Sequence, residues 1–223
     1  MKNKKRNWFL RTFDIRMWLY DFVKWTGYPL TWLIIRTKRH FIGGKKDKDL
    51  FKGKFIVASN HLSYWDPFTA ISVIPGRRVV HMATKKLFQK WCGWFFKAVG
   101  IIEIDNHHLS TKAFRKAKNT LDRGHIVCMF PEGSVSLDNE LHEYKSGAVM
   151  LSALAKADIL PIYLGKRKTF VQRKVAIVGH KLKYQDLFKS EMPTKEEIIK
   201  ATSVLMEKEK ELENRFKELY EKR

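Results

Sequence analysis

Residues 55–67 read Phe-Ile-Val-Ala-Ser-Asn-His-Leu-Ser-Tyr-Trp-Asp-Pro. The first four are apolar and typical of a buried strand, and Pro67 begins a second apolar run that continues to Ile74. A regular helix would hold His61 and Asp66 apart, because five residues turn through about 500°. A strand-to-helix turn can bring them together, with Asp66 at the N-cap and Pro67 in the first helical position. The stretch therefore predicts such a turn.

A histidine beside a carboxylate is a common general base. The carboxylate orients one ring nitrogen and stabilises the imidazolium that forms when the other nitrogen takes a proton. The ordinary alternative is that Asp66 only caps the helix and that His61 only bonds to the backbone. These two residues alone leave both interpretations open.

The rest of the chain alternates between short apolar runs and helical patterns. This alternation predicts an α/β domain with a mainly parallel sheet flanked by helices, in which ligands bind at the carboxyl ends of the strands. Residues 194–222 predict a long amphipathic C-terminal helix that packs on the domain. Strands are expected at 54–59, 79–84, 100–104, 125–130, 159–164 and 174–179, and helices at 67–74, 86–98, 109–123 and 145–157.

The charge is strongly basic and unevenly placed. The 223 residues carry a formal net charge of +21, and residues 1–54 hold 15 Lys/Arg against 4 Asp/Glu, whereas residues 194–223 hold 8 of each. An anionic partner is indicated: nucleic acid, an anionic bilayer or a phosphorylated small molecule. Cys92 and Cys128 lie in apolar surroundings without metal-ligand spacing, which predicts buried free thiols in a reducing compartment.

The front end is rich in aromatic and basic residues. Residues 25–35 carry no charge, but a bilayer-spanning helix needs about 20 such residues, and Pro29 predicts a break or a helix start near it. Residues 1–42 are therefore interpreted as two helices lying in the membrane interface. The alternatives are helices that cover the sheet of a soluble domain and a tilted span of residues 17–35. The expected division is 1–42 membrane-associating helices, 43–193 catalytic domain and 194–223 C-terminal helix.

Two further stretches carry polar groups suited to an anion. Phe130-Pro-Glu-Gly-Ser134 closes a predicted strand, and Glu143-Tyr-Lys-Ser-Gly-Ala148 opens a predicted helix. The first places a carboxylate and a flexible backbone at the sheet rim. In the second, Lys145 and the amides of the helix start can hold an anion. Each stretch alone is also compatible with a simple turn.

Together these stretches resemble a known family. Asn-His-x-Ser-x-x-Asp at 60–66, the Phe-Pro-Glu-Gly-Ser stretch and Tyr-Lys-Ser-Gly-Ala, in this order, are similar to the glycerophospholipid acyltransferases, above all the 1-acylglycerol-3-phosphate (lysophosphatidate) acyltransferases. Residues 81–88 and Leu160-Pro-Ile162 are similar to two further blocks of that family. The resemblance covers about residues 50–180.

The resemblance implies an O-acyltransferase with His61 as general base and Asp66 as its partner. A hydroxyl of the acceptor would attack the thioester of acyl-CoA or of acyl-carrier protein, and no metal or other cofactor is implied. The implied partners are a lysophospholipid acceptor, the acyl thioester and an anionic membrane surface at its cytoplasmic face, but no nucleic acid. The acceptor-site residues carried over are Glu132, Gly133, Ser134, Lys145, Asn106 and Lys85.

The sequence departs from the family pattern at two arginines. Asn106 and Val135 stand where the family has arginines thought to hold the acceptor phosphate. Either other basic residues bind the phosphate (Lys85, Lys86, Lys145 or Arg78), or the acceptor is a larger-headgroup lysophospholipid or another hydroxylated or aminated lipid. An alternative from another class is a non-catalytic protein that binds anionic membranes. Residues 87–99 are aromatic-rich and are interpreted as core, with an acyl-chain groove as the alternative.

Overall fold

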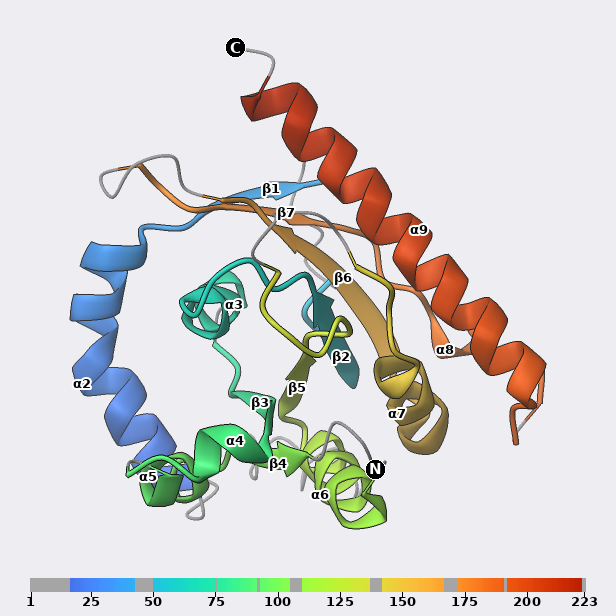
Figure 1. Ribbon diagram of the computed structural model, residues 1–223, viewed down its shortest axis with the longest axis horizontal. Helices are drawn as coiled ribbons and strands as arrows, with labels where there is room; N and C mark the ends of the chain where they lie inside the picture. The colour runs from blue at the N-terminus through green and yellow to red at the C-terminus, as the bar shows by residue number, and fades with distance from the viewer. Residues whose placement is uncertain are drawn as a thin grey trace.

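The computed structural model describes residues 17–42, 50–74, 76–91, 93–104, 110–136, 142–166, 172–190 and 192–221. Within them the chain alternates between strands and helices, as Figure 1 shows. The strands are β1 (Lys38–Phe41), β2 (Phe55–Ser59), β3 (Val79–Thr84), β4 (Ile102–Ile104), β5 (Ile126–Met129), β6 (Asp158–Leu164) and β7 (Val175–Val178). The helices are α2 (Trp18–Ile35), α3 (Asp66–Val73), α4 (Lys85–Phe88), α5 (Gly93–Ala98), α6 (Thr111–Asp122), α7 (Gly147–Ala155), α8 (Tyr184–Leu187) and α9 (Lys195–Tyr220).

The strands form one sheet in the order β1-β7-β6-β2-β5-β3-β4. The five strands from β6 to β4 are parallel, β7 runs antiparallel to β6, and β1 runs parallel to β7. The carboxyl ends of the five parallel strands therefore share one edge of the sheet with the amino ends of β1 and β7. This architecture confirms the predicted α/β fold with a mainly parallel sheet.

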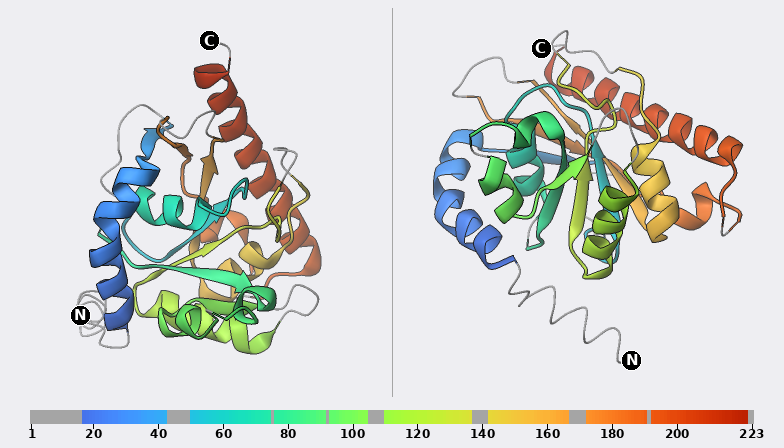
Figure 2. Two further views of the ribbon diagram at one scale, coloured as in Figure 1. Left: turned by 60° about the vertical axis from the view of Figure 1, so that its left-hand side comes forward. Right: turned by 60° about the horizontal axis from the view of Figure 1, so that its bottom comes forward.

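Helices cover both faces of the sheet, because the side chains of each strand alternate in direction. Phe55 and Val57 of β2 belong to a core that includes α3, whereas Ile56 and Ala58 belong to the opposite core with α6, α7 and the first half of α9. Figures 1 and 2 show α2 and α3 on one side of the sheet and α7 and α9 on the other. The turn after β2 thus lies at an edge of the sheet, where helices cover both faces.

The long C-terminal helix confirms its prediction. Its start is a capping box: the Thr194 hydroxyl accepts from the Glu197 N–H at 3.3 Å, and the Glu197 carboxylate accepts from the Thr194 N–H at 3.0 Å. An apolar stripe that includes Leu205, Leu212 and Phe216 is buried against the sheet.

The front end differs from its prediction. The predicted break at Pro29 is wrong, because α2 is one continuous helix from Trp18 to Ile35. Pro29 cannot donate to the carbonyl of residue 25, but Trp25 is exposed, so water can satisfy that carbonyl. The first helix of the pair is predicted at residues 7–24; α2 contains its last part, and residues 7–16 lie outside the described residues. None of the helices in the described part of the chain is long and apolar enough to cross a bilayer.

The first turns of α2 are attached to the sheet. The Val79 N–H donates to the Tyr20 hydroxyl at 3.0 Å, and the Arg78 guanidinium pairs with both carboxylate oxygens of Asp21 at 2.8 and 2.6 Å. Directly after α2, β1 joins the sheet, a strand that the sequence did not predict because its residues read as a basic flank. The front end is therefore part of the domain from at least Tyr20 onward.

Residues 86–98 were predicted as one helix, but they form two short ones, α4 and α5. The backbone of Gly93, at the start of α5, lies so close to Phe88 that a Cβ there would be 1.9 Å from the Phe88 carbonyl oxygen. Only glycine fits there, and the close approach ends the helical run. The expectation of core packing is also wrong for its tryptophans, since Trp91 and Trp94 are 90% and 68% exposed.

Candidate active site

The turn after β2 brings the predicted pair together. His61 Nδ1 lies 3.2 Å from Asp66 Oδ2, and the Asp66 side chain is fully buried while that of His61 is 16% exposed. Because Nδ1 faces the carboxylate, Nε2 is the ring nitrogen left for a substrate. The pair lies at the edge where the five parallel strands end.

The prediction that Asp66 is the N-cap residue of the helix is wrong. Trp65 occupies the N-cap position of α3, and Asp66 is the first helical residue. The Asp66 Oδ2 atom instead accepts from the Leu62 N–H at 2.7 Å and the Ser63 N–H at 2.6 Å, within the turn that precedes the helix. The carboxylate therefore fixes the turn that carries His61, as well as the ring itself.

Aromatic packing holds the His61 ring. The ring stacks on Phe130, with centroids 4.1 Å apart and planes 20° apart. On β3, His81 lies nearly parallel to Phe130, with centroids 6.1 Å apart. Burial, with a smaller contribution from the nearby His61, lowers the pKa of His81 to about 4, so that His81 is a neutral ring at physiological pH.

The Pro-Glu-Gly turn lies directly against the histidine turn. The His61 N–H donates to Glu132 Oε1 at 3.4 Å, and the Ser136 N–H donates to the His61 carbonyl at 2.7 Å. Glu132 is buried, whereas Ser134 is exposed at the rim. The predicted Glu132 and His61 are thus brought together through the His61 backbone.

Lys145 also reaches this turn. Its N–H donates to the Pro131 carbonyl at 3.0 Å, and its ammonium lies so near Gly133 that a Cβ there would be 3.0 Å from Lys145 Nζ. Gly133 has φ +77°, which favours glycine. An exposed cation therefore stands over the backbone beside Glu132.

The other predicted cations are placed differently. Lys85 and Lys86 are exposed at the start of α4, directly after the carboxyl end of β3. Arg78 precedes β3, at the opposite edge of the sheet, and its guanidinium is occupied by Asp21, so its proposed role in phosphate binding is wrong. Asn106 lies outside the described residues, as does Cys92, while Cys128 is a buried free thiol as predicted.

Three residues near the pair were missed by the sequence reasoning. The Asn60 amide donates to the Leu164 carbonyl at 3.1 Å and accepts from the Leu164 N–H at 2.7 Å, which ties the end of β2 to the end of β6. Lys174, directly before β7, pairs with Asp66 Oδ1. Glu209 of α9 is fully buried near Asn60 and Tyr144, and burial raises its carboxyl pKa well above the usual range.

Only one of these three had a usable signal. Glu209 falls on the apolar stripe of α9, four residues after Leu205 and three before Leu212, a spacing that places it on the buried face. Lys174 is expected as the first residue of the strand 174–179, after a basic stretch, and nothing in that pattern connects it to Asp66. The Asn60 amide bonds depend on a partner 104 residues away.

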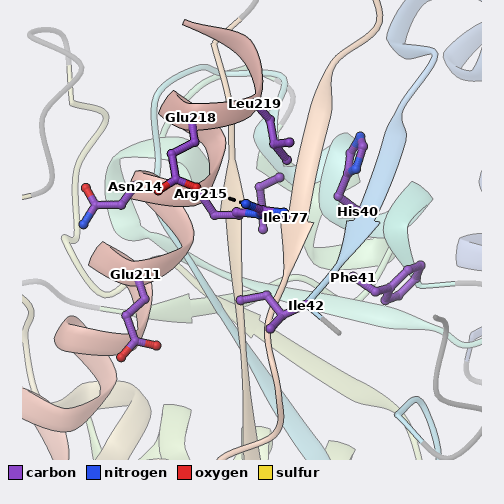
Figure 3. Close-up of a pocket in the computed structure, with 9 residues that line it drawn as sticks. All are labelled: His40, Phe41, Ile42, Ile177, Glu211, Asn214, Arg215, Glu218 and Leu219. Atoms are coloured by element: carbon purple, nitrogen blue, oxygen red, sulfur yellow. Dashed lines mark hydrogen bonds and ion pairs between the residues drawn. The ribbon is translucent and has the colours of Figure 1, made fainter. Parts of the chain in front are cut away.

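A separate cavity of about 570 Å³ lies at the β1 edge of the sheet, against the C-terminal half of α9 (Figure 3). Its walls include Phe41 and Ile177 on the strands and Arg215 and Glu218 on the helix, the last two joined by an ion pair. None of its lining residues belongs to the site around His61. The chemistry is assigned to the histidine turn and not to this cavity.

The α/β fold with a His–Asp turn at the ends of its parallel strands is compatible with an O-acyltransferase. Comparison with known proteins supports this class of enzyme. The profile of the acyltransferase family matches residues 36–165, and the chain belongs to that family.

Particular relatives sharpen the assignment. The chain is 30% identical over 172 residues to the 1-acyl-sn-glycerol-3-phosphate acyltransferase of Bacillus subtilis (strain 168). The aligned region covers 74% of this chain and 84% of that protein. It is 28% identical over 123 residues to 1-acyl-sn-glycerol-3-phosphate acyltransferase alpha of Homo sapiens, covering 54% of this chain and 44% of that protein.

A solved structure has the same fold. The crystal structure of the 1-acyl-sn-glycerophosphate (LPA) acyltransferase PlsC from Thermotoga maritima matches with a TM-score of 0.61 and 16% identity, over 89% of this chain and 80% of that one. At this identity the match speaks for the fold, while the family membership rests on the sequence.

Proposed function

We propose that this chain transfers a fatty acyl group from acyl-CoA or acyl-carrier protein to the free hydroxyl of 1-acylglycerol-3-phosphate, giving phosphatidic acid. The observation that carries the proposal is the His61–Asp66 contact of 3.2 Å at the carboxyl edge of the sheet. The relatives named as acyltransferases of that substrate support the choice of acceptor.

In the proposed reaction, His61 Nε2 takes the proton of the acceptor hydroxyl as the oxygen attacks the thioester carbonyl. The Asp66 carboxylate stabilises the imidazolium that forms. A carbon–oxygen bond forms, the carbon–sulfur bond breaks, and the imidazolium returns the proton to the leaving thiolate. Transfer is direct, without an acyl-enzyme. We also propose that no cofactor takes part, because the thioester is already an activated acyl donor.

For the acceptor phosphate we propose Lys145, with Lys85 and the turn of Glu132, Gly133 and Ser134 beside it. Lys145 is exposed and stands over Gly133, next to the turn that contacts His61. A lysine is a point charge without the planar fork of arginine. It suits a phosphate whose orientation is set elsewhere, and it offsets the loss of the family arginine at Val135.

An acceptor panel tests this assignment. With one acyl-CoA donor, lysophosphatidate is expected to be the best acceptor, and Lys145→Met is expected to raise its KM about tenfold with little change in kcat, because one charge-assisted contact is lost. Exposed Lys200→Met on α9 is the matched control. The measurement is the initial rate at varied acceptor concentration.

The same panel separates the second candidate. Val135 in place of the family arginine favours an acceptor other than a simple phosphomonoester. A wild-type preference for a lysophospholipid with a larger head group, or for an aminated lipid, would replace lysophosphatidate in the proposal. Binding of vesicles without transfer to any acceptor would favour the non-catalytic alternative.

We further propose that an aromatic face of α2 binds the membrane. Trp18, Phe22 and Trp25 are 63%, 58% and 82% exposed, and their spacing of four and three residues places them on one side of the helix. Met17 before α2 lies against Gly100 after α5, so the end of α5 is near the start of α2. Exposed tryptophans among basic residues suit the interface of an anionic bilayer, and the buried Cys128 thiol fits its cytoplasmic, reducing side.

Replacing Trp18, Phe22 and Trp25 together by serine is expected to weaken binding to anionic phospholipid vesicles at least about tenfold, which corresponds to about 1.4 kcal/mol. Sedimentation with vesicles measures the partition. Serine at Met192 and Ile199, also exposed but near the start of α9, is the matched control. Side-chain replacement is preferred to truncation because β1 and Tyr20 belong to the fold. Unchanged binding of the triple variant would contradict the proposal.

A further inference from the structure

We propose that Lys174 is the third member of the catalytic chain, a positioning residue that acts on His61 through Asp66. The inference rests on the proposed role of His61 as general base. It adds a residue from the far end of the motif region, directly before β7, which runs antiparallel to its neighbour β6.

The geometry places Lys174 behind the dyad. Its side chain is 4% exposed, and its ammonium bonds to Oδ1 of the fully buried Asp66, the oxygen that does not face His61. Oδ2 serves the His61 ring and two backbone N–H groups. Each carboxylate oxygen therefore has its own task, one toward the histidine and one toward the lysine.

Strand direction explains why a residue 108 positions away reaches this carboxylate. β7 runs antiparallel to β6, so that the residue before β7 lies at the edge where β2 ends. The Lys174 carbonyl accepts from the Lys38 N–H at 2.7 Å, which anchors the start of β7 to the start of β1. Two packed strands thus hold the backbone from which the ammonium reaches Asp66.

The charges define the effect. A buried carboxylate without a cation would draw a proton onto the neighbouring imidazole, and a protonated imidazole cannot act as a base. Lys174 neutralises Asp66 in the resting enzyme, while the 3.2 Å contact still orients the His61 ring. The lysine therefore opposes the transfer of a proton onto His61 by the neighbouring carboxylate, so that the ring is available as a base.

Other titratable groups also face His61. Glu132, on the turn after β5, accepts from its backbone N–H, and His81 on β3 lies across Phe130 as a neutral ring. Glu209 of α9 lies near Asn60, and burial raises the pKa of its carboxyl well above the usual range. Among the described residues, Lys174 is the lysine or arginine that pairs with the Asp66 carboxylate, so its removal is expected to have an effect that Glu132, His81 and Glu209 do not reproduce.

The test compares Lys174→Met and Lys174→Arg with wild type in two readouts. The first is the pH profile of kcat/KM, whose acidic limb is expected to move to higher pH by about one unit or more in Lys174→Met. Activity near pH 7 then falls and is partly regained at higher pH. Lys174→Arg keeps the charge and is expected to keep the limb near its wild-type position.

The second readout is the NMR titration of the His61 ring, assigned by its absence in His61→Ala. Its midpoint is expected to move in the same direction without any substrate, so it separates failure of this inference from failure of the proposed function. Lys54→Met, which breaks a Lys–Asp pair with Asp122 at the other edge of the sheet, is the matched control and should move neither readout. A limb and midpoint that stay in place in Lys174→Met would overturn the proposal.

Lys174→Met leaves a buried carboxylate without its cation and can lose its fold. In that event Lys174→Met combined with Asp66→Asn, which removes both charges, is expected to fold with most of the wild-type thermal stability. Failure of this double variant to fold would assign Lys174 a packing role only and would also overturn the proposal.

Discussion

Alanine in place of Asp66 is expected to abolish transfer and to lower the free energy of unfolding by about 3–5 kcal/mol. The carboxylate is fully buried and contacts four groups at once: the His61 ring, two N–H groups of the turn, and the Lys174 ammonium. Its removal leaves a 4% exposed ammonium without a counter-charge. Urea unfolding monitored by tryptophan fluorescence measures the stability, and acyl transfer at matched enzyme concentration measures the activity.

Asp66→Asn separates the two effects. The amide fills the same space but carries no charge, so part of the stability should return while the rate stays about 10²–10⁴-fold below wild type. Exposed Asp186→Ala on α8 is the control and should change neither quantity. Near-wild-type transfer by Asp66→Asn would show that the charge of Asp66 has no role in the reaction.

His61→Ala is expected to lower kcat/KM about 10²–10⁴-fold. Its effect on the free energy of unfolding is expected to be much smaller than that of Asp66→Ala. The ring is partly exposed and its packing partner is one aromatic face, that of Phe130, so little core is lost. The loss should appear in kcat more than in the KM of either substrate, because the proton transfer occurs in the transition state.

Two controls accompany this variant. His180→Ala removes an exposed histidine from the segment after β7 and should leave the rate unchanged. Added imidazole should restore part of the activity of His61→Ala, since a small base can occupy the space of the missing ring. A His61→Ala enzyme as fast as wild type would remove the general base from the account.

The sequence predicted the turn at His61 and Asp66, and with it the α/β fold, because these features are local. An apolar run, a histidine, an aspartate and a proline within 13 residues specify a strand, a turn and a helix start. The capping box at Thr194 and Glu197 is local in the same way. The N-cap prediction for Asp66 was wrong because its carboxylate accepts hydrogen bonds from two N–H groups of the turn before the helix, and not from the helix.

What the sequence could not provide depends on contacts between distant segments. Lys174 reaches Asp66 only because β7 is antiparallel, a direction that periodicity does not reveal. β1 pairs with a strand more than 130 residues later, so from the sequence its basic residues resemble a flank of the helices that were expected at the membrane interface. Gly93 ended the helix after Lys85 through a contact with the Phe88 carbonyl that composition does not show.

Direct transfer from thioester to the lysophosphatidate hydroxyl is tested by one experiment with two analyses of the same sample. The wild-type chain is mixed with labelled acyl-CoA, with and without lysophosphatidate, and the lipids and the intact protein are both examined by mass spectrometry. Labelled phosphatidate should form only with the acceptor, and the protein mass should stay unchanged in both samples. Absence of phosphatidate, or an acylated protein that passes its label to the acceptor, would contradict the account.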